Sequence, residues 1–196
     1  MSSNGGAIPR VTAIGCGACH TPKTMTPSGP KSDSSRLLAG HPEGSSLGPP
    51  PSLGAGPWVA VSAWDTTAWA GPWGVSYSAN LTPDENTGLG SWSEEAFVRA
   101  LRTGRHMGVS RLILPPMPWG AFRNFTDEDL RSIYAYLKTV PPVKNRVPEP
   151  LPPPVESLLR EDHAVRQSRP LPAMGPLAVD EVEADLPVRI AKRLVK

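Results

Sequence analysis

The chain has 196 residues, and 20 Lys and Arg against 18 Asp and Glu give a formal net charge of +2. This near balance does not provide the single-sign field that indicates a nucleic-acid or anionic-membrane partner. The 25 prolines and 18 glycines disfavour long regular elements, because proline removes a backbone donor and fixes φ. No apolar run approaches the roughly 20 residues that span a bilayer. Residues 1–15 show no basic start followed by an apolar stretch, so no signal peptide is visible.

Both cysteines of the chain lie in one hexapeptide, "GCGACH", at residues 15–20. The pattern Cys16-x-x-Cys19-His20 is the signature of covalent c-type haem attachment. Two thiols one turn apart can each add to one haem vinyl group, and the next residue then supplies an imidazole to the iron. The motif therefore predicts a haem domain. A short helix is expected before Cys16, limited by Pro9 and Gly15.

Two other kinds of site use such cysteine pairs. A redox dithiol normally opens a helix within a βαβ pattern, and no strand of that kind precedes Cys16. A structural zinc site needs four ligands, usually as two close pairs, but the chain has no second cysteine pair. Haem attachment is therefore favoured over both.

Residues 41–80 form an insert rich in glycine, proline and tryptophan. Alternation around Trp58–Ala63 and Gly74–Ala79 predicts short strands or a small β-hairpin. A cover over one haem edge and a docking surface are the functional interpretations. A long loop with its own small core has at least equal weight.

Two amphipathic helices are predicted after the insert. The first spans about Ser93–Thr103, with serine caps at its start and Gly104 after its end. The second spans about Asp127–Thr139, begins after Thr126, and carries three acidic residues in its first turn. The apolar side chains of the second helix recur at i, i+3, i+4 and i+7: Leu130, Ile133, Tyr134 and Leu137. The two apolar faces predict a core that also surrounds the haem.

The segment "LILPPMPWGAF" contains the preferred candidate for a second axial ligand, Met117. Three neighbouring prolines, at positions 115, 116 and 118, stiffen its backbone, so the thioether can be held toward a fixed target. Methionine is a soft ligand that raises the haem potential. Most methionines are core fillers, so that interpretation stays open. The rival ligands are Met107, His41 and His106, and a histidine would give a lower potential.

The chain changes character after Pro142, where prolines become frequent and periodicity is weak. We expect a haem domain at residues 1–142 and an extended or disordered proline-rich tail at residues 143–196.

Several separated motifs together resemble one known family. They are "GCGACHTPK", "SRLLAGHPEG", "GPWGVSYSANLTPDENTGLGSWSEEAFVRALRTGRHMG", "ILPPMPW" and "TDEDLRSIYAYLKTVPPVKNRVPEP". In this order they resemble bacterial single-haem c-type cytochromes, similar to the cytochrome c domains that accompany periplasmic dehydrogenases. The likeness covers about residues 14–150. Family members usually carry an export signal and a longer helix before the CxxCH motif, and this sequence departs from them there.

The resemblance implies a mainly α fold, namely a small class I cytochrome c-like helical domain with long proline- and glycine-rich loops. It implies one covalently attached haem c, with Cys16 and Cys19 as thioether anchors, His20 as proximal ligand and Met117 as distal ligand. It also implies a periplasmic electron carrier without catalytic activity of its own.

The expected partners are a dehydrogenase and a terminal acceptor, with no nucleic acid and no membrane span. Four basic residues are candidates for partner docking: Lys23, Arg99, Arg102 and Arg105. Two other functions stay open. One is a haem enzyme or gas sensor with an exchangeable sixth ligand, and the other is a haem-free thiol or structural protein.

Overall fold

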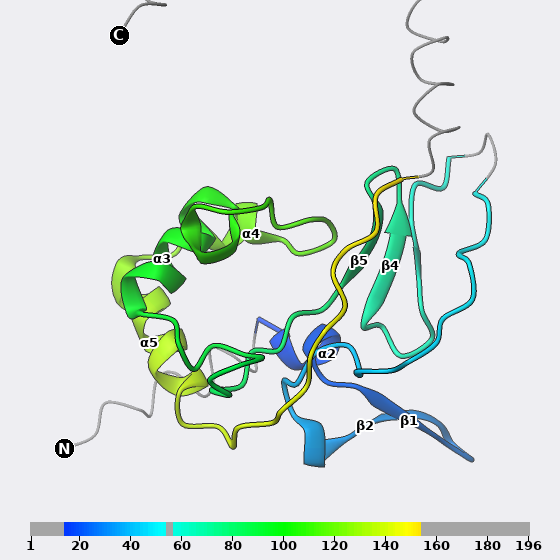
Figure 1. Ribbon diagram of the computed structural model, residues 1–196, viewed down its shortest axis with the longest axis horizontal. Coiled ribbons are helices and arrows are strands. Elements are labelled where there is room, and N and C mark those ends of the chain that lie inside the picture. The colour runs from blue at the N-terminus through cyan, green and yellow to red at the C-terminus, as the bar shows by residue number, and fades with distance from the viewer. Residues whose placement is uncertain (1–13, 54–56, 154–196) are drawn as a thin grey trace, which may run out of the picture. The chain divides into compact units, whose positions relative to one another are not determined.

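The computed structural model describes residues 14–53 and 57–153 (Figure 1). Within these ranges the α-helices are α2 (Cys16–His20), α3 (Glu94–Thr103), α4 (Trp119–Phe122) and α5 (Asp127–Leu137). The strands are β1 (Lys23–Thr26), β2 (Gly29–Ser32), β3 (Val61–Ser62), β4 (Ala68–Gly71) and β5 (Gly74–Tyr77). Two short 3-10 helices are η2 (Ser34–Arg36) and η3 (His106–Gly108). The helix expected before Cys16 falls outside the described residues.

The expectation of a mainly α fold is wrong. The described residues form two antiparallel sheets, one with the order β1-β2 and one with the order β3-β4-β5, and the longest α-helix has only 11 residues. Glycines with positive φ begin the second strand of each tight hairpin, Gly29 at φ 108° and Gly74 at φ 93°. Each of these hairpins pairs the backbone N–H and C=O groups of two four-residue strands. A chain rich in glycine and proline can form such a hairpin where a helix would be broken. The described part of the insert thus holds three strands. Alternation predicted β3 and β5, whereas the sequence did not indicate β4.

The two predicted amphipathic helices are confirmed as α3 and α5. The Ser93 side chain accepts a hydrogen bond from the Ala96 backbone N–H at 3.2 Å, and Gly104, at φ 66°, ends α3 in the left-handed conformation. A capping box between Thr126 and Asp129 starts α5. No α-helix in the described ranges is long and apolar enough to cross a membrane.

The apolar faces of α3 and α5 pack together as the centre of the core. Figure 1 shows these helices near α4, with the β4–β5 hairpin apart from them. The buried core cluster consists of Leu38, Leu89, Phe97, Leu101, Leu130, Ile133, Leu137 and Val140. Leu130, Ile133 and Leu137 of the stripe on α5 are therefore core, as its periodicity predicted, and Tyr134 packs partly buried against them.

The segment 143–153 follows α5 and runs extended past β5 (yellow in Figure 1). Asn145, 1% exposed, is its anchor. The Asn145 amide donates to the carbonyls of Ala39 (2.7 Å) and His41 (2.8 Å), and its oxygen accepts from the Arg36 guanidinium and the Glu43 N–H (both 2.8 Å). Farther on, Leu151 forms a β-bridge with Val75. The rest of the expected tail, from residue 154 on, lies outside the described residues.

Replacing Asn145 is expected to destabilise the fold. A buried polar group left without its partner costs about 1–3 kcal/mol, so we expect Asn145→Ala to lower the free energy of unfolding by about 2–4 kcal/mol. Denaturant unfolding followed by tryptophan fluorescence measures the change. The exposed Asn124 provides the matched control, and Asn124→Ala should cost less than about 0.5 kcal/mol. Equal effects of the two variants would contradict the anchoring role.

Candidate functional site

A cavity of about 520 Å³ brings the four predicted site residues together. Its wall includes Cys16, Cys19, His20 and Met117, which come from α2 and from the loop before α4. The volume lies within the roughly 300–1,000 Å³ typical of ligand cavities. Much of the remaining wall is apolar and includes Trp92, Phe97, Leu101, Phe122, Ile133 and Leu137. The core and the cavity thus share their side chains, as expected if a large apolar group is to be buried there.

His20 is buried and held by a hydrogen bond from its ring. The Nδ1 atom lies 2.8 Å from the Ala79 carbonyl oxygen, which can only accept, so Nδ1 carries the proton. Burial lowers the pKa of His20, and the Ala79 hydrogen bond offsets part of this effect. The ring is therefore neutral, with an unprotonated Nε2 at the cavity wall, which is the state that metal ligation requires.

The two cysteines are free thiols on the short helix α2, three residues apart and half-buried. Burial raises the pKa of the Cys16 thiol, so the thiolate is disfavoured there. Reactive redox cysteines have lowered pKa values. The environment of Cys16 thus opposes the dithiol interpretation.

Helix α2 has only five residues, and its N-cap, Gly15, makes no side-chain capping bond. Its carbonyl groups are instead held by other segments. Thr66 Oγ1 and Lys23 Nζ donate to Ala18 O (2.8 and 3.0 Å), Ser78 Oγ donates to Cys19 O (2.6 Å), and the Gly40 N–H donates to His20 O (2.7 Å). Thr66 and Ser78 were missed in the sequence, which contains no motif that marks them. They belong to the β3–β5 insert, so this insert supports the CxxCH turn.

Met117 lines the cavity in a loop with several fixed points. Its carbonyl accepts from the Trp119 N–H at 2.9 Å, and Ser76 Oγ in β5 donates to Pro115 O at 2.5 Å. Of the rival ligands, Met107 and His106 also line the cavity. The cavity wall therefore holds three candidates for a second axial ligand.

His41, the remaining rival, does not line the cavity. It is 1% exposed, and its Nδ1 lies 2.8 Å from Thr67 Oγ1, which in turn donates to Asp65 Oδ2 at 2.7 Å. Among the described residues, its buried Nε2 has no hydrogen-bond partner. Burial lowers the pKa of His41, with Asp65 raising it and Arg36 lowering it further. His41 is thus a buried neutral histidine beside the site.

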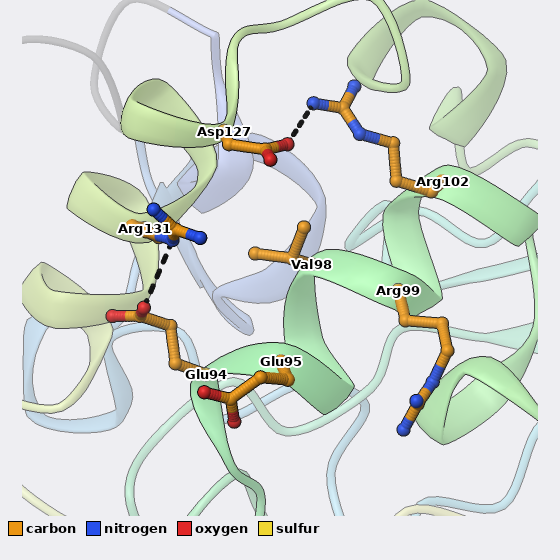
Figure 2. Close-up of a pocket in the computed structure, with 7 residues that line it drawn as sticks. All are labelled: Glu94, Glu95, Val98, Arg99, Arg102, Asp127 and Arg131. Carbon is orange, nitrogen blue, oxygen red and sulfur yellow. Dashed lines mark hydrogen bonds and ion pairs between the residues drawn. The ribbon is translucent and has the colours of Figure 1, made fainter.

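A smaller pocket of about 340 Å³ lies on the α3–α5 surface and is drawn in Figure 2. Its side chains are mostly charged, and two ion pairs cross it: Arg102 to Asp127 at 2.6 Å and Arg131 to Glu94 at 3.2 Å. None of the predicted site residues lines this pocket. It is a polar groove in which charged groups of the two helices pair with one another.

Comparison with known proteins gives relatives that are parts of dehydrogenases. A nicotinate dehydrogenase subunit of Pseudomonas putida is 44% identical over 77 residues, covering 39% of this chain and 6% of that protein. The fructose dehydrogenase cytochrome subunit of Gluconobacter japonicus is 38% identical over 89 residues, covering 42% and 18%. The cytochrome c subunit of alcohol dehydrogenase (quinone) of Gluconobacter oxydans is 39% identical over 82 residues, covering 40% and 17%. No family model matches the chain.

These relatives confirm the resemblance that the motifs indicated. The CxxCH turn and a largely apolar cavity beside it are features typical of c-type cytochromes. The chain is related to cytochrome subunits of bacterial dehydrogenases. It spans less than a fifth of the length of each of the three relatives.

The buried His41 predicts a pH-dependent stability. Its lowered pKa means that the unfolded chain binds the proton more readily, so the contribution is fully present above the unfolded value of about 6.5 and is lost as pH falls below it. The melting temperature should fall between pH 7.5 and pH 5.5, and His41→Gln should reduce this fall. An unchanged pH dependence in the variant would show that His41 titrates normally in the folded state.

Proposed function

We propose that this chain is an electron-transfer cytochrome c with one covalently attached haem c. The observation that carries the proposal is the meeting of Cys16, Cys19, His20 and Met117 on the wall of one largely apolar cavity. The residues fit the group: two free thiols one turn apart, a neutral imidazole with a fixed tautomer, and a thioether.

The residues have distinct roles in this proposal. The Cys16 and Cys19 thiols would hold the haem through thioether links, and His20 Nε2 and the Met117 thioether would be its proximal and distal ligands. Bound haem would supply a centre that exchanges one electron between Fe(III) and Fe(II). With His20 and Met117 both binding the iron, no ligand position would be left for a substrate. The chain is therefore proposed to carry electrons rather than to catalyse a reaction by itself.

We further propose a periplasmic location, with a dehydrogenase as electron donor and a separate terminal acceptor. The relatives support a dehydrogenase as the electron donor because they are subunits of nicotinate, fructose and alcohol dehydrogenases. In this proposal the haem domain occupies residues 1–142, and the proline-rich part, which starts at Val143, adds Val147, Pro148 and Pro150 to the cavity wall.

The attachment is tested with exported protein produced together with a haem-ligation system. Haem should stay with the polypeptide through acid–acetone extraction and a denaturing gel, because a thioether link survives both treatments. Cys16→Ala or Cys19→Ala should weaken or abolish the covalent haem signal, and the double variant should abolish it. The matched control is Ser28→Ala, in the exposed turn between β1 and β2 and outside the cavity wall, which leaves both thiols in place and should retain covalent haem. Exported protein that carries no covalent haem would refute the proposed function.

The distal ligand is tested by substituting each candidate in turn. Met117→Ala should open the iron, giving high-spin ferric haem, CO binding in the ferrous state and a lower potential. Met117→His should keep a low-spin spectrum and also lower the potential. Met107→Ala and His106→Ala are the controls on the same wall, and His41→Ala is the control outside it. Visible spectroscopy and redox titration measure the outcome. If only one of the control variants gave an open haem, the distal ligand would be that residue and not Met117.

A further inference from the structure

The cavity has an exposed border that the proposed haem site does not use. The loop 105–112 and residues 148–151 meet there, and we call these residues the rim. Arg111 Nε lies 3.4 Å from Glu149 Oε2, and this ion pair joins the two parts. Both Arg111 and Glu149 also line the cavity.

Three large apolar side chains of the rim are exposed: Val109 (70%), Leu112 (56%) and Leu151 (52%). None of them lines the cavity, although each is within two residues of one that does. A group that fills the cavity would therefore leave these three side chains facing water. Exposed apolar side chains framed by polar groups are typical of protein interaction sites.

The rim also carries a positive charge. It contains two arginines, Arg105 and Arg111, and one acidic residue, Glu149, which pairs with Arg111. Arg105, at the start of the rim loop, has no ion pair among the described residues, and its guanidinium donates to Ser110 O at 3.0 Å. The positive charge of Arg105 is therefore not paired within the described residues and is available to groups outside the loop.

The rim loop is already ordered in the free chain. Arg105 and Leu112 form a β-bridge, and the His106 N–H donates to Arg111 O at 2.9 Å. Met107 and Gly108 both have positive φ, 54° and 78°, and a Cβ on Gly108 would meet Arg99 Cγ at 2.4 Å. The loop is thus packed closely against α3, so little conformational entropy would be lost on docking.

From these observations we infer that the rim is the docking surface for an electron-transfer protein whose contact face has an apolar centre and acidic surroundings. The inference rests on the proposed function, because it takes the cavity to hold the redox centre. The apolar side chains of the rim match the centre of such a face, and the unpaired Arg105 matches its carboxylates. Lys23 and Arg102 are excluded from this role, because Lys23 is bonded to Ala18 and Asp65 and Arg102 to Asp127.

The test uses the full chain with its haem and plastocyanin, an acidic copper protein, as the probe. In each productive encounter the ferrous chain loses one electron and Cu(II) plastocyanin gains it as Cu(I), with no proton or bond change. Stopped-flow absorbance gives the second-order rate constant at low and high ionic strength. Arg105→Glu and Val109→Asp are the rim variants. Lys31→Glu and Met25→Asp are their matched controls, on the exposed β1–β2 hairpin outside the cavity wall.

At low salt we expect each rim variant to slow the reaction by about fivefold or more, because reversing or adding a charge at a docking surface mainly changes the association rate. The control variants should stay within about twofold, and high salt should reduce the effect of Arg105→Glu. The reduced visible spectrum should not change in any variant. Equal slowing by rim and hairpin variants, or no slowing by the rim variants, would overturn the inference while leaving the haem proposal intact. Absence of covalent haem would instead refute the proposed function.

Discussion

The hydrogen bond from His20 Nδ1 to the Ala79 carbonyl is the contact on which the arrangement of the site depends. Helix α2 is too short to be stable alone, since isolated helices shorter than roughly 12 residues are marginal in water. Its orientation must therefore come from other segments, and residues 66–81 provide most of the contacts. Ser78 illustrates this: its N–H donates to Thr67 O, its carbonyl accepts from the His41 N–H, and its hydroxyl donates to Cys19 O. The small sheet thus positions the CxxCH turn, and this gives the glycine- and tryptophan-rich insert a physical role.

The core and the cavity impose a second constraint, because they are built from the same side chains. Phe97, Leu101, Ile133 and Leu137 belong to the buried cluster and also line the cavity. Burial of these residues stabilises the contact between α3 and α5 and at the same time keeps water from the site. Segment 143–153 contributes to the same wall through Val147, Pro148 and Pro150. Its anchor, Asn145, therefore supports both the fold and the enclosure of the cavity.

The parts that the sequence predicted correctly are those specified by neighbouring residues. The serine and threonine caps of α3 and α5 and the apolar stripe on α5 can each be identified within about a dozen residues. Alternation indicated β3 and β5, but β1, β2 and β4 were not predicted, since strands of two to four residues carry little alternation. Asn145 and Ser78 bond to partners 104–106 and 59 positions away, respectively, and no local pattern contains that information. The mainly α expectation failed for the same reason, because helix signals are local and strong whereas those of short hairpins are weak.

The three candidate distal ligands on the wall differ mainly in how their backbones are held. Met117 lies among prolines, and β5 holds the preceding Pro115 carbonyl through Ser76. Met107 has φ 54°, is 38% exposed and belongs to the rim. His106 packs edge-on against Trp92, with ring centroids 4.9 Å apart, and moving it to an iron would cost that contact. A thioether is a soft, neutral ligand. The entropy that is lost when its loop becomes ordered is therefore a large part of the free energy of ligation. The fixed loop before α4 therefore favours Met117, whereas ligation by Met107 or His106 would disturb the packed rim loop. Without that disturbance the rim loop stays available for contact with another protein.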